Sequence, residues 1–186
     1  MDILAHTLWA NYGGRAANKL ISKKKKNIPK INIFWVSFMG VFPDFFAFGI
    51  PFFIILWQII TGDLSLSSFG SHHAPAGVNF DLSAYLYQYS HSLVVWALVF
   101  IVFWFIYKRP RFELLGWALH ILIDIPSHSI DFFPTPFLFP ISEYRFPYGI
   151  QWSNRWYMII NYSLLLAISI FLIIRHYKNK KKNNLV

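Results

Sequence analysis

The sequence predicts an all-α, polytopic integral membrane protein: a helix bundle with about four main membrane segments. Of its 186 residues, 56% are hydrophobic and 20% are aromatic, whereas only 13% are charged. A soluble domain of this length does not need so large an apolar fraction. The 20 Phe, 8 Trp and 10 Tyr residues can fill the membrane segments and the interfacial belts at their ends. We expect one membrane domain, residues 1–176, followed by a disordered basic tail, residues 177–186.

The basic residues support the same class because they gather at the ends of apolar segments. All but two of the 17 Lys and Arg residues fall into three clusters, at residues 15–30, 108–111 and 175–182. This is the positive-inside pattern, so the clusters and the C-terminus should face the cytoplasm. We expect membrane lipids as partners, with anionic headgroups at the basic clusters. No nucleic-acid recognition module accompanies the clusters, so no nucleic acid is expected, and the sequence identifies no protein partner.

The N-terminal region carries a histidine whose position relative to the membrane stays open. Residues 1–12 form a short amphipathic segment that contains His6, and Gly13-Gly14 should end or bend it. A basic helical stretch to Lys30 follows. Residues 1–20 can cross the membrane, re-enter it or lie on its surface.

The first long apolar segment, residues 31–61, exceeds the ~20 residues of one untilted span. Glycines and prolines interrupt it, so we expect a helix that breaks near Pro43-Asp44. Irregular backbone at membrane depth is tolerated only where it is buried in protein or lines a cavity. Asp44 should therefore face such a cavity.

The remaining elements alternate between apolar segments and loops. Two polar loops should face outward, namely residues 62–82, which contain His72-His73, and residues 126–155, which are rich in proline and aromatic residues. Between these loops we expect a span over residues 83–107 and a helix over residues 112–125. The last span is predicted over residues 156–174.

Two histidines and a carboxylate follow one another in the apolar run that begins at Gly116. His120 and Asp124 are four residues apart, so a helix places them on one face. His128 extends this row if the helix survives Pro126, which lacks a backbone donor. Ionisable groups in apolar surroundings are costly and rarely face lipid, so the default interpretation is a metal or proton site inside the bundle.

Further ionisable residues should reach the same region. On the expected topology His91, Asp124 and His128 share a depth near the outer face, and Asp44 can approach them from the helix break. The chain has no cysteine, so imidazole and carboxylate must hold any metal, which suits Zn, Mn, Fe or Co. The candidate metal ligands are His6, Asp44, His91, His120, Asp124 and His128. Each also has a simpler role open to it, such as an interhelical hydrogen bond or, for Asp44, a helix cap.

The candidates lie in four short motifs: His6, Pro43-Asp44, Ser90-His91-Ser92 and Gly116-xxx-His120-xxx-Asp124. An N-terminal His, a Pro-Asp, a Thr-His-Ser and a Gly-xxx-His-xxx-Asp occur in this order in the LexA-binding, inner-membrane-associated metal-dependent hydrolases, which the chain resembles. More distantly, the row that ends at His128 is similar to the His-xxx-Asp helix motif of zinc-dependent phospholipases C. The chain departs from the family pattern at Leu86 and Tyr87, where the family often has His-Arg.

The resemblance implies metal-assisted hydrolysis at a bacterial-type inner (plasma) membrane, with a divalent metal, zinc first and Mn or Fe next. Asp44 and His91 are then the candidate catalytic residues, Asp44 as a ligand or a general base. The expected depth of the site favours a lipid-linked or phosphate-ester substrate near the outer membrane face. Two alternatives stay open: a non-catalytic carrier of metal or protons, and a structural membrane protein whose polar residues hold its helices together.

Overall fold

The computed structural model describes residues 1–24, 28–64, 78 and 80–183, and its regular structure within these residues is entirely helical. The elements are α1 (Ile3–Lys24), α2 (Ile33–Met39), α3 (Phe42–Thr61), α4 (Asp81–Ser90), α5 (Leu93–Tyr107), the 3-10 turn η2 (Phe112–Leu114), α6 (Leu115–Ser127) and α7 (Arg155–Asn183).

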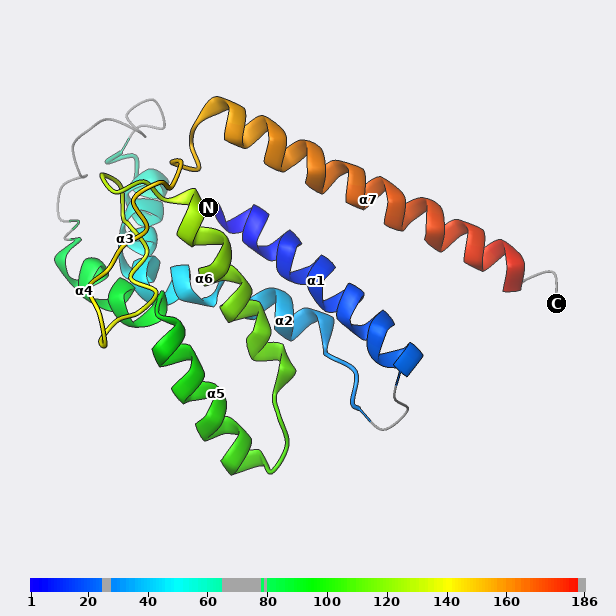
Figure 1. Cartoon of the computed structure of the whole chain (residues 1–186). Coiled ribbons are helices and arrows are strands. Elements are labelled where there is room, and N and C mark those ends of the chain that lie inside the picture. The colour runs from blue at the N-terminus through cyan, green and yellow to red at the C-terminus, as the bar shows by residue number, and fades with distance from the viewer. Residues whose placement is uncertain (25–27, 65–77, 79, 184–186) are drawn as a thin grey trace.

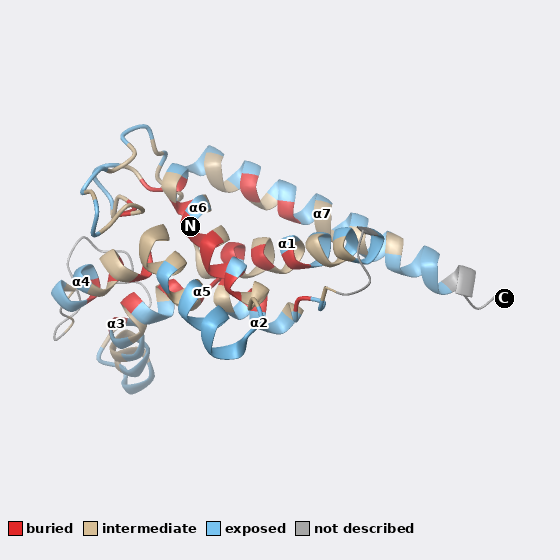
Figure 2. Cartoon of the chain, turned by 60° about the horizontal axis from the view of Figure 1, so that its bottom comes forward, coloured by how far each residue is buried: buried red, intermediate tan, exposed pale blue. Residues whose placement is uncertain are grey.

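Helix α6 is central to the packing, because it contacts α1, α2, α3 and α5 (Figure 1). More than half of its residues are buried, and α1 contributes further buried residues beside it (Figure 2). Helix α7 lies alongside α1. The helix predicted over residues 112–125 is thus confirmed, as η2 followed by α6.

Two described helices are long and apolar enough to cross a membrane, namely α3 and the part of α7 from Arg155 to Lys180. Helices α4 and α5 together form a third candidate, bent by 60°. Large apolar side chains on these helices are exposed, including Phe53 of α3 and Phe105 of α5 at 68% and 70%. The structure therefore supports two to three candidate spans, and the predicted number of four is not confirmed.

The first apolar segment is not confirmed as one broken span. It forms α2, with 7 residues, and α3, with 20 residues, which separate at Gly40-Val41. At 1.5 Å per residue α2 is only ~10 Å long, so α3 alone reaches the length of a span. Pro43 and Asp44 lie in the first turn of α3, where backbone N–H groups have no helical acceptor and proline is tolerated.

The span predicted over residues 83–107 bends between α4 and α5. Helix α5 begins anew because Ser92 caps it: its Oγ accepts hydrogen bonds from the backbone N–H groups of Val94 and Val95, at 3.1 and 3.2 Å. His91 lies at the resulting corner, where it is the C-cap residue of α4.

The N-terminal helix is longer than predicted. Gly13-Gly14 do not end the N-terminal helix, since α1 continues to Lys24. A Cβ atom at Gly14 would lie 2.7 Å from Val36 Cγ1, so this glycine allows α1 to pack closely against α2. At the other end of the chain, α7 extends to Asn183, seven residues into the predicted tail. His72-His73 lie outside the described residues.

Candidate metal centre

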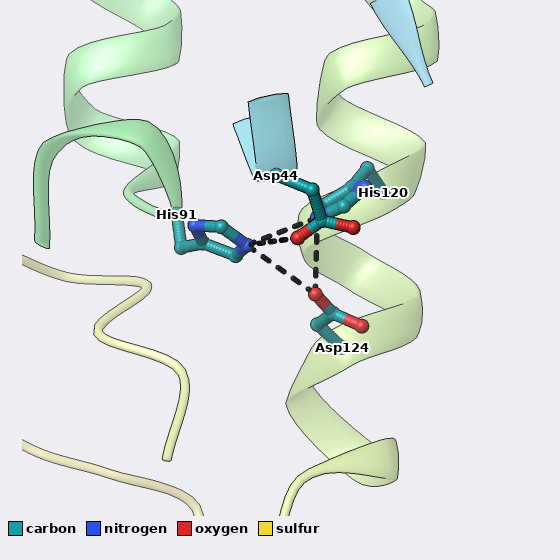
Figure 3. Close-up of side chains that lie close together, drawn as sticks. All are labelled: Asp44, His91, His120 and Asp124. Atoms are coloured by element: carbon teal, nitrogen blue, oxygen red, sulfur yellow. Dashed lines mark hydrogen bonds and ion pairs between the residues drawn. The ribbon is translucent and has the colours of Figure 1, made fainter. Parts of the chain in front are cut away.

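Two carboxylates and two imidazoles converge between α3, the α4–α5 corner and α6 (Figure 3). Asp44, His91, His120 and Asp124 each offer one ligand atom, and these atoms all lie within 4.8 Å of one another. The Nε2 atoms of His91 and His120 are 3.0 Å apart. Asp124 Oδ2 is 3.0 Å from His120 Nε2, and Asp44 Oδ1 is 3.5 Å from His91 Nε2. The four residues therefore lie close enough to bind a metal ion.

Close packing of α6 against α2 brings these residues together. A Cβ atom at Gly116 would lie 2.1 Å from the carbonyl oxygen of Val36, so only glycine permits this approach. One turn further along α6, Nδ1 of His120 lies 2.8 Å from the carbonyl oxygen of Gly40, the residue that ends α2. The chain then turns into α3, which places Asp44 beside His120.

Three histidine rings are fixed through Nδ1, so that Nε2 points toward the carboxylates. The Nδ1 atoms of His120, His128 and His91 contact the Gly40 carbonyl, the Phe133 carbonyl and the Ser90 hydroxyl, at 2.8, 2.9 and 2.9 Å. A carbonyl oxygen only accepts, so Nδ1 carries the proton in the first two rings. A partner that holds the second nitrogen in this way is typical of metal-ligating histidine.

The facing atoms at the centre favour a cation between them. A neutral His120 that is protonated on Nδ1 presents a lone pair on Nε2, and this lone pair faces Oδ2 of Asp124. That oxygen is buried, and among the described residues it has no partner in hydrogen-bonding geometry. Facing lone pairs repel one another, and the low dielectric of a buried site strengthens the repulsion. A metal ion or a proton at this position removes it.

A second group of side chains surrounds the other oxygen of Asp124. His6 Nε2 lies 3.0 Å and His128 Nε2 lies 3.4 Å from Oδ1, and the amino group of Met1 lies 2.5 Å from it. The His6 ring stacks on that of His120, with centroids 3.7 Å apart. Neither ring nitrogen of His6 has a hydrogen bond within the described part of the chain. The structure thus brings all six candidate residues into one cluster that shares Asp124.

The cluster is almost closed to solvent. His6, His91, His120 and Asp124 are at most 1% exposed, whereas the side chain of Asp44 is 13% exposed. Water can therefore reach the four-residue group at Asp44.

The sequence prediction missed the groups that hold His91 in place. The ring of Tyr87 stacks on His91 with centroids 3.8 Å apart, and its hydroxyl donates to the Phe133 carbonyl at 2.9 Å. Trp117 Nε1 donates to the Ser90 carbonyl at 2.6 Å, which ties the corner to α6. The spacing of four residues between Tyr87 and His91 could have indicated the stacking, because such residues share a helix face.

Comparison of the chain with protein-family models, curated proteins and solved structures found no match. The family resemblance therefore stays a prediction. The fold and the site define a helical protein with two to three helices able to cross a membrane and a buried centre able to hold a metal ion.

Proposed function

We propose that the chain is a metal-dependent hydrolase of a bacterial-type inner (plasma) membrane, with its C-terminus in the cytoplasm. One observation carries the proposal: two Nε2 atoms and two carboxylate oxygens converge in a buried site while the rings are held through Nδ1. Imidazole and carboxylate together form the usual ligand set of hydrolytic metal sites. This set suits Zn, Mn, Fe or Co, and the family resemblance favours zinc first and Mn or Fe next.

The buried and the solvent-accessible residues of the site are suited to different roles. A divalent metal, when bound, polarises an ester and activates water for attack. His91, His120 and Asp124 are buried and held in place by their neighbours, which suits them to bind and orient the metal. Asp44 is the member of this group that solvent reaches, so its carboxylate can ligate or accept a proton from an entering water molecule.

We propose a lipid-linked or phosphate-ester substrate at the outer membrane face. The support is the position of the cluster: it lies at the end of α6 where the loop of residues 128–154 begins, and His128 belongs to both. The basic residues 108–111 follow the far end of α5, whose near end adjoins His91. On the positive-inside rule α5 then runs from the cluster to the cytoplasmic side, which supports a site away from that side.

A non-catalytic carrier of metal or protons is the second candidate function. It is favoured by the 3.0 Å approaches of His120 Nε2 to both His91 Nε2 and Asp124 Oδ2, which could share a proton as readily as a metal ion. A purely structural role for the same polar residues is the third.

Metal content and turnover of the purified full-length protein, measured together, test these candidates. We expect near-stoichiometric divalent metal, and release of phosphate or headgroup from a panel of lipid phosphoesters that a chelator stops and zinc restores. Bound metal without turnover, together with ion flux into liposomes, would replace the hydrolase by the carrier. A protein without metal, turnover or flux would leave only the structural role.

A further inference from the structure

A groove of about 890 Å³ lies between α1 and α7, remote from the residues proposed for catalysis. The two helices run in the same direction and are joined by polar contacts along their first halves. Trp9 Nε1 donates to Asn161 Oδ1 at 2.9 Å, and the hydroxyls of Tyr12 and Ser169 are 2.5 Å apart. The groove opens beside and beyond these contacts.

The lining of the groove changes from apolar to basic along both helices. On α1, Trp9 is followed by Arg15 and Lys19, and on α7, Phe171 is followed by Arg175. Because the helices are parallel, both basic ends lie at the same end of the groove. The lining of the groove is therefore complementary to an amphiphile, with a long apolar part and one charged end. Its apolar part is completed by Leu119, Ile168 and Leu172.

A fourth basic residue reaches this end from another segment. Lys30 precedes Ile31, whose backbone N–H and carbonyl both bond to the side-chain amide of Asn18, at 2.7 and 2.8 Å. This pair of hydrogen bonds fixes Lys30 beside α1, where it lines the groove. No Asp or Glu occurs among the described residues that line it. Four cations gathered without a carboxylate form a site for an anion.

We propose that this groove binds an anionic phospholipid, with its phosphate among Arg15, Lys19, Lys30 and Arg175 and an acyl chain along the apolar wall. The basic end alone would accept any anion, and the apolar wall alone any lipid tail. The two together in one groove select a molecule that carries both. The inference is independent of the proposed hydrolase activity, because its residues are not those of the metal centre.

The test measures retention of phosphatidylglycerol and phosphatidylcholine by the full-length protein in detergent, using native mass spectrometry across a lipid titration. The test variant neutralises the basic end: R15Q/K19Q/K30Q/R175Q. The control variant removes the same number of charges from exposed positions outside the groove: K23Q/R109Q/K178Q/K180Q. All eight side chains are at least partly exposed, so both variants should fold.

We expect the test variant to bind phosphatidylglycerol at least about tenfold more weakly than the parent, and the control variant to stay within about twofold. Ile168→Trp, which fills the apolar part and leaves the charges intact, should also weaken binding severalfold. Excess inorganic phosphate should not displace the lipid.

Equal losses in the two charge variants would overturn the proposal in favour of general charge attraction. Equal retention of phosphatidylcholine by the parent would overturn it by removing the role of the headgroup. Displacement by phosphate, or an unaffected Ile168→Trp variant, would mean that the basic end binds a free anion and the apolar wall takes no part.

Discussion

Asp124 is the residue on which the whole cluster depends, because each of its carboxylate oxygens faces different histidines. Oδ2 lies 3.0 Å from His120 Nε2 and 3.5 Å from His91 Nε2, while Oδ1 faces His6 and His128. A carboxylate that is 1% exposed is stable only with such partners. Removing it should therefore affect both groups of histidines at once.

Replacing Asp124 or His120 by alanine should remove most of the bound metal. Loss of groups that merely support a metal ligand costs about 10–100-fold in affinity, and loss of a ligand should exceed this. Metal content and affinity are measured on protein purified in detergent, with His176→Ala, an exposed histidine of α7, as the control. If Asp124→Ala and His120→Ala both keep full metal content, these residues are not ligands.

Asp44→Asn should lower hydrolytic activity by roughly 100-fold or more, the scale of a general base. The amide keeps the shape of the side chain and removes its charge, and Asp44 is the solvent-accessible member of its group. Folding should survive, because a partly exposed amide in the first turn of α3 can still bond to water. Phosphate or headgroup release is measured beside metal content, and a variant as active as the parent would exclude Asp44 from the mechanism.

Ser90→Ala tests the support of His91. The Ser90 hydroxyl lies 2.9 Å from His91 Nδ1, so its loss frees the ring to rotate and should weaken metal binding by about 10–100-fold. Ser83→Ala removes an equally buried hydroxyl from the same helix, without contact to His91, and should leave the affinity unchanged. Equal affinities for the two variants would show that Ser90 does not orient the ring.

At the scale of the elements, the crossing of α6 over α2 positions the metal centre. A methyl group at Gly116 would lie 2.1 Å from a backbone oxygen, which cannot move without displacing α2. Gly116→Ala should therefore destabilise the protein by about 1–3 kcal/mol or more and lower its metal content. Gly49→Ala is the matched control, because a Cβ atom there meets nothing within 4 Å and alanine favours the helix. Thermal unfolding in detergent measures both, and a Gly116→Ala variant as stable as Gly49→Ala would contradict the close crossing.

Local patterns predicted those elements whose boundaries depend on local chemistry. The spacing of His120 and Asp124 on one face of α6 is a property of helix geometry, and the structure retains it. The bend at His91 was not predicted, because the sequence around Ser92 also suits a continuous helical span. Whether Ser92 caps a new helix or lies inside a continuous one depends on tertiary packing. The effect of Gly13-Gly14 was also mispredicted because it depends on tertiary packing. Their low helix propensity is outweighed by the close contact that Gly14 makes with Val36.

At the scale of the whole molecule, the sequence indicated the six side chains of the cluster, and the structure supplied their grouping and the contact of the Met1 amino group with Asp124. The cost of ionisable residues in apolar segments singled out five of the six candidates without knowledge of the helix packing, and His6 was added by the motif order of the family resemblance. Which of them face Oδ1 and which face Oδ2 of Asp124 depends on long-range contacts. One example is the packing of α1 against α6, which stacks His6 on His120. Such contacts leave no periodic signal in the chain.

The orientation of the whole molecule decides which side of the membrane supplies the substrate. Helices α1 and α7 carry basic residues toward their C-terminal ends, and basic residues follow α5, whereas His6 lies near the start of α1. Because the positive-inside rule places basic ends in the cytoplasm, a reporter fused after Lys182 should be cytoplasmic and one inserted near Pro75 should be external. Enzymatic reporters that are active on only one side of the membrane measure this. The same insertions in a K178Q/K180Q background should show a weaker bias if the C-terminal cluster contributes to it. The reverse result would place the metal centre at the cytoplasmic face, and a cytoplasmic phosphate ester would then replace an outer-leaflet lipid as the expected substrate.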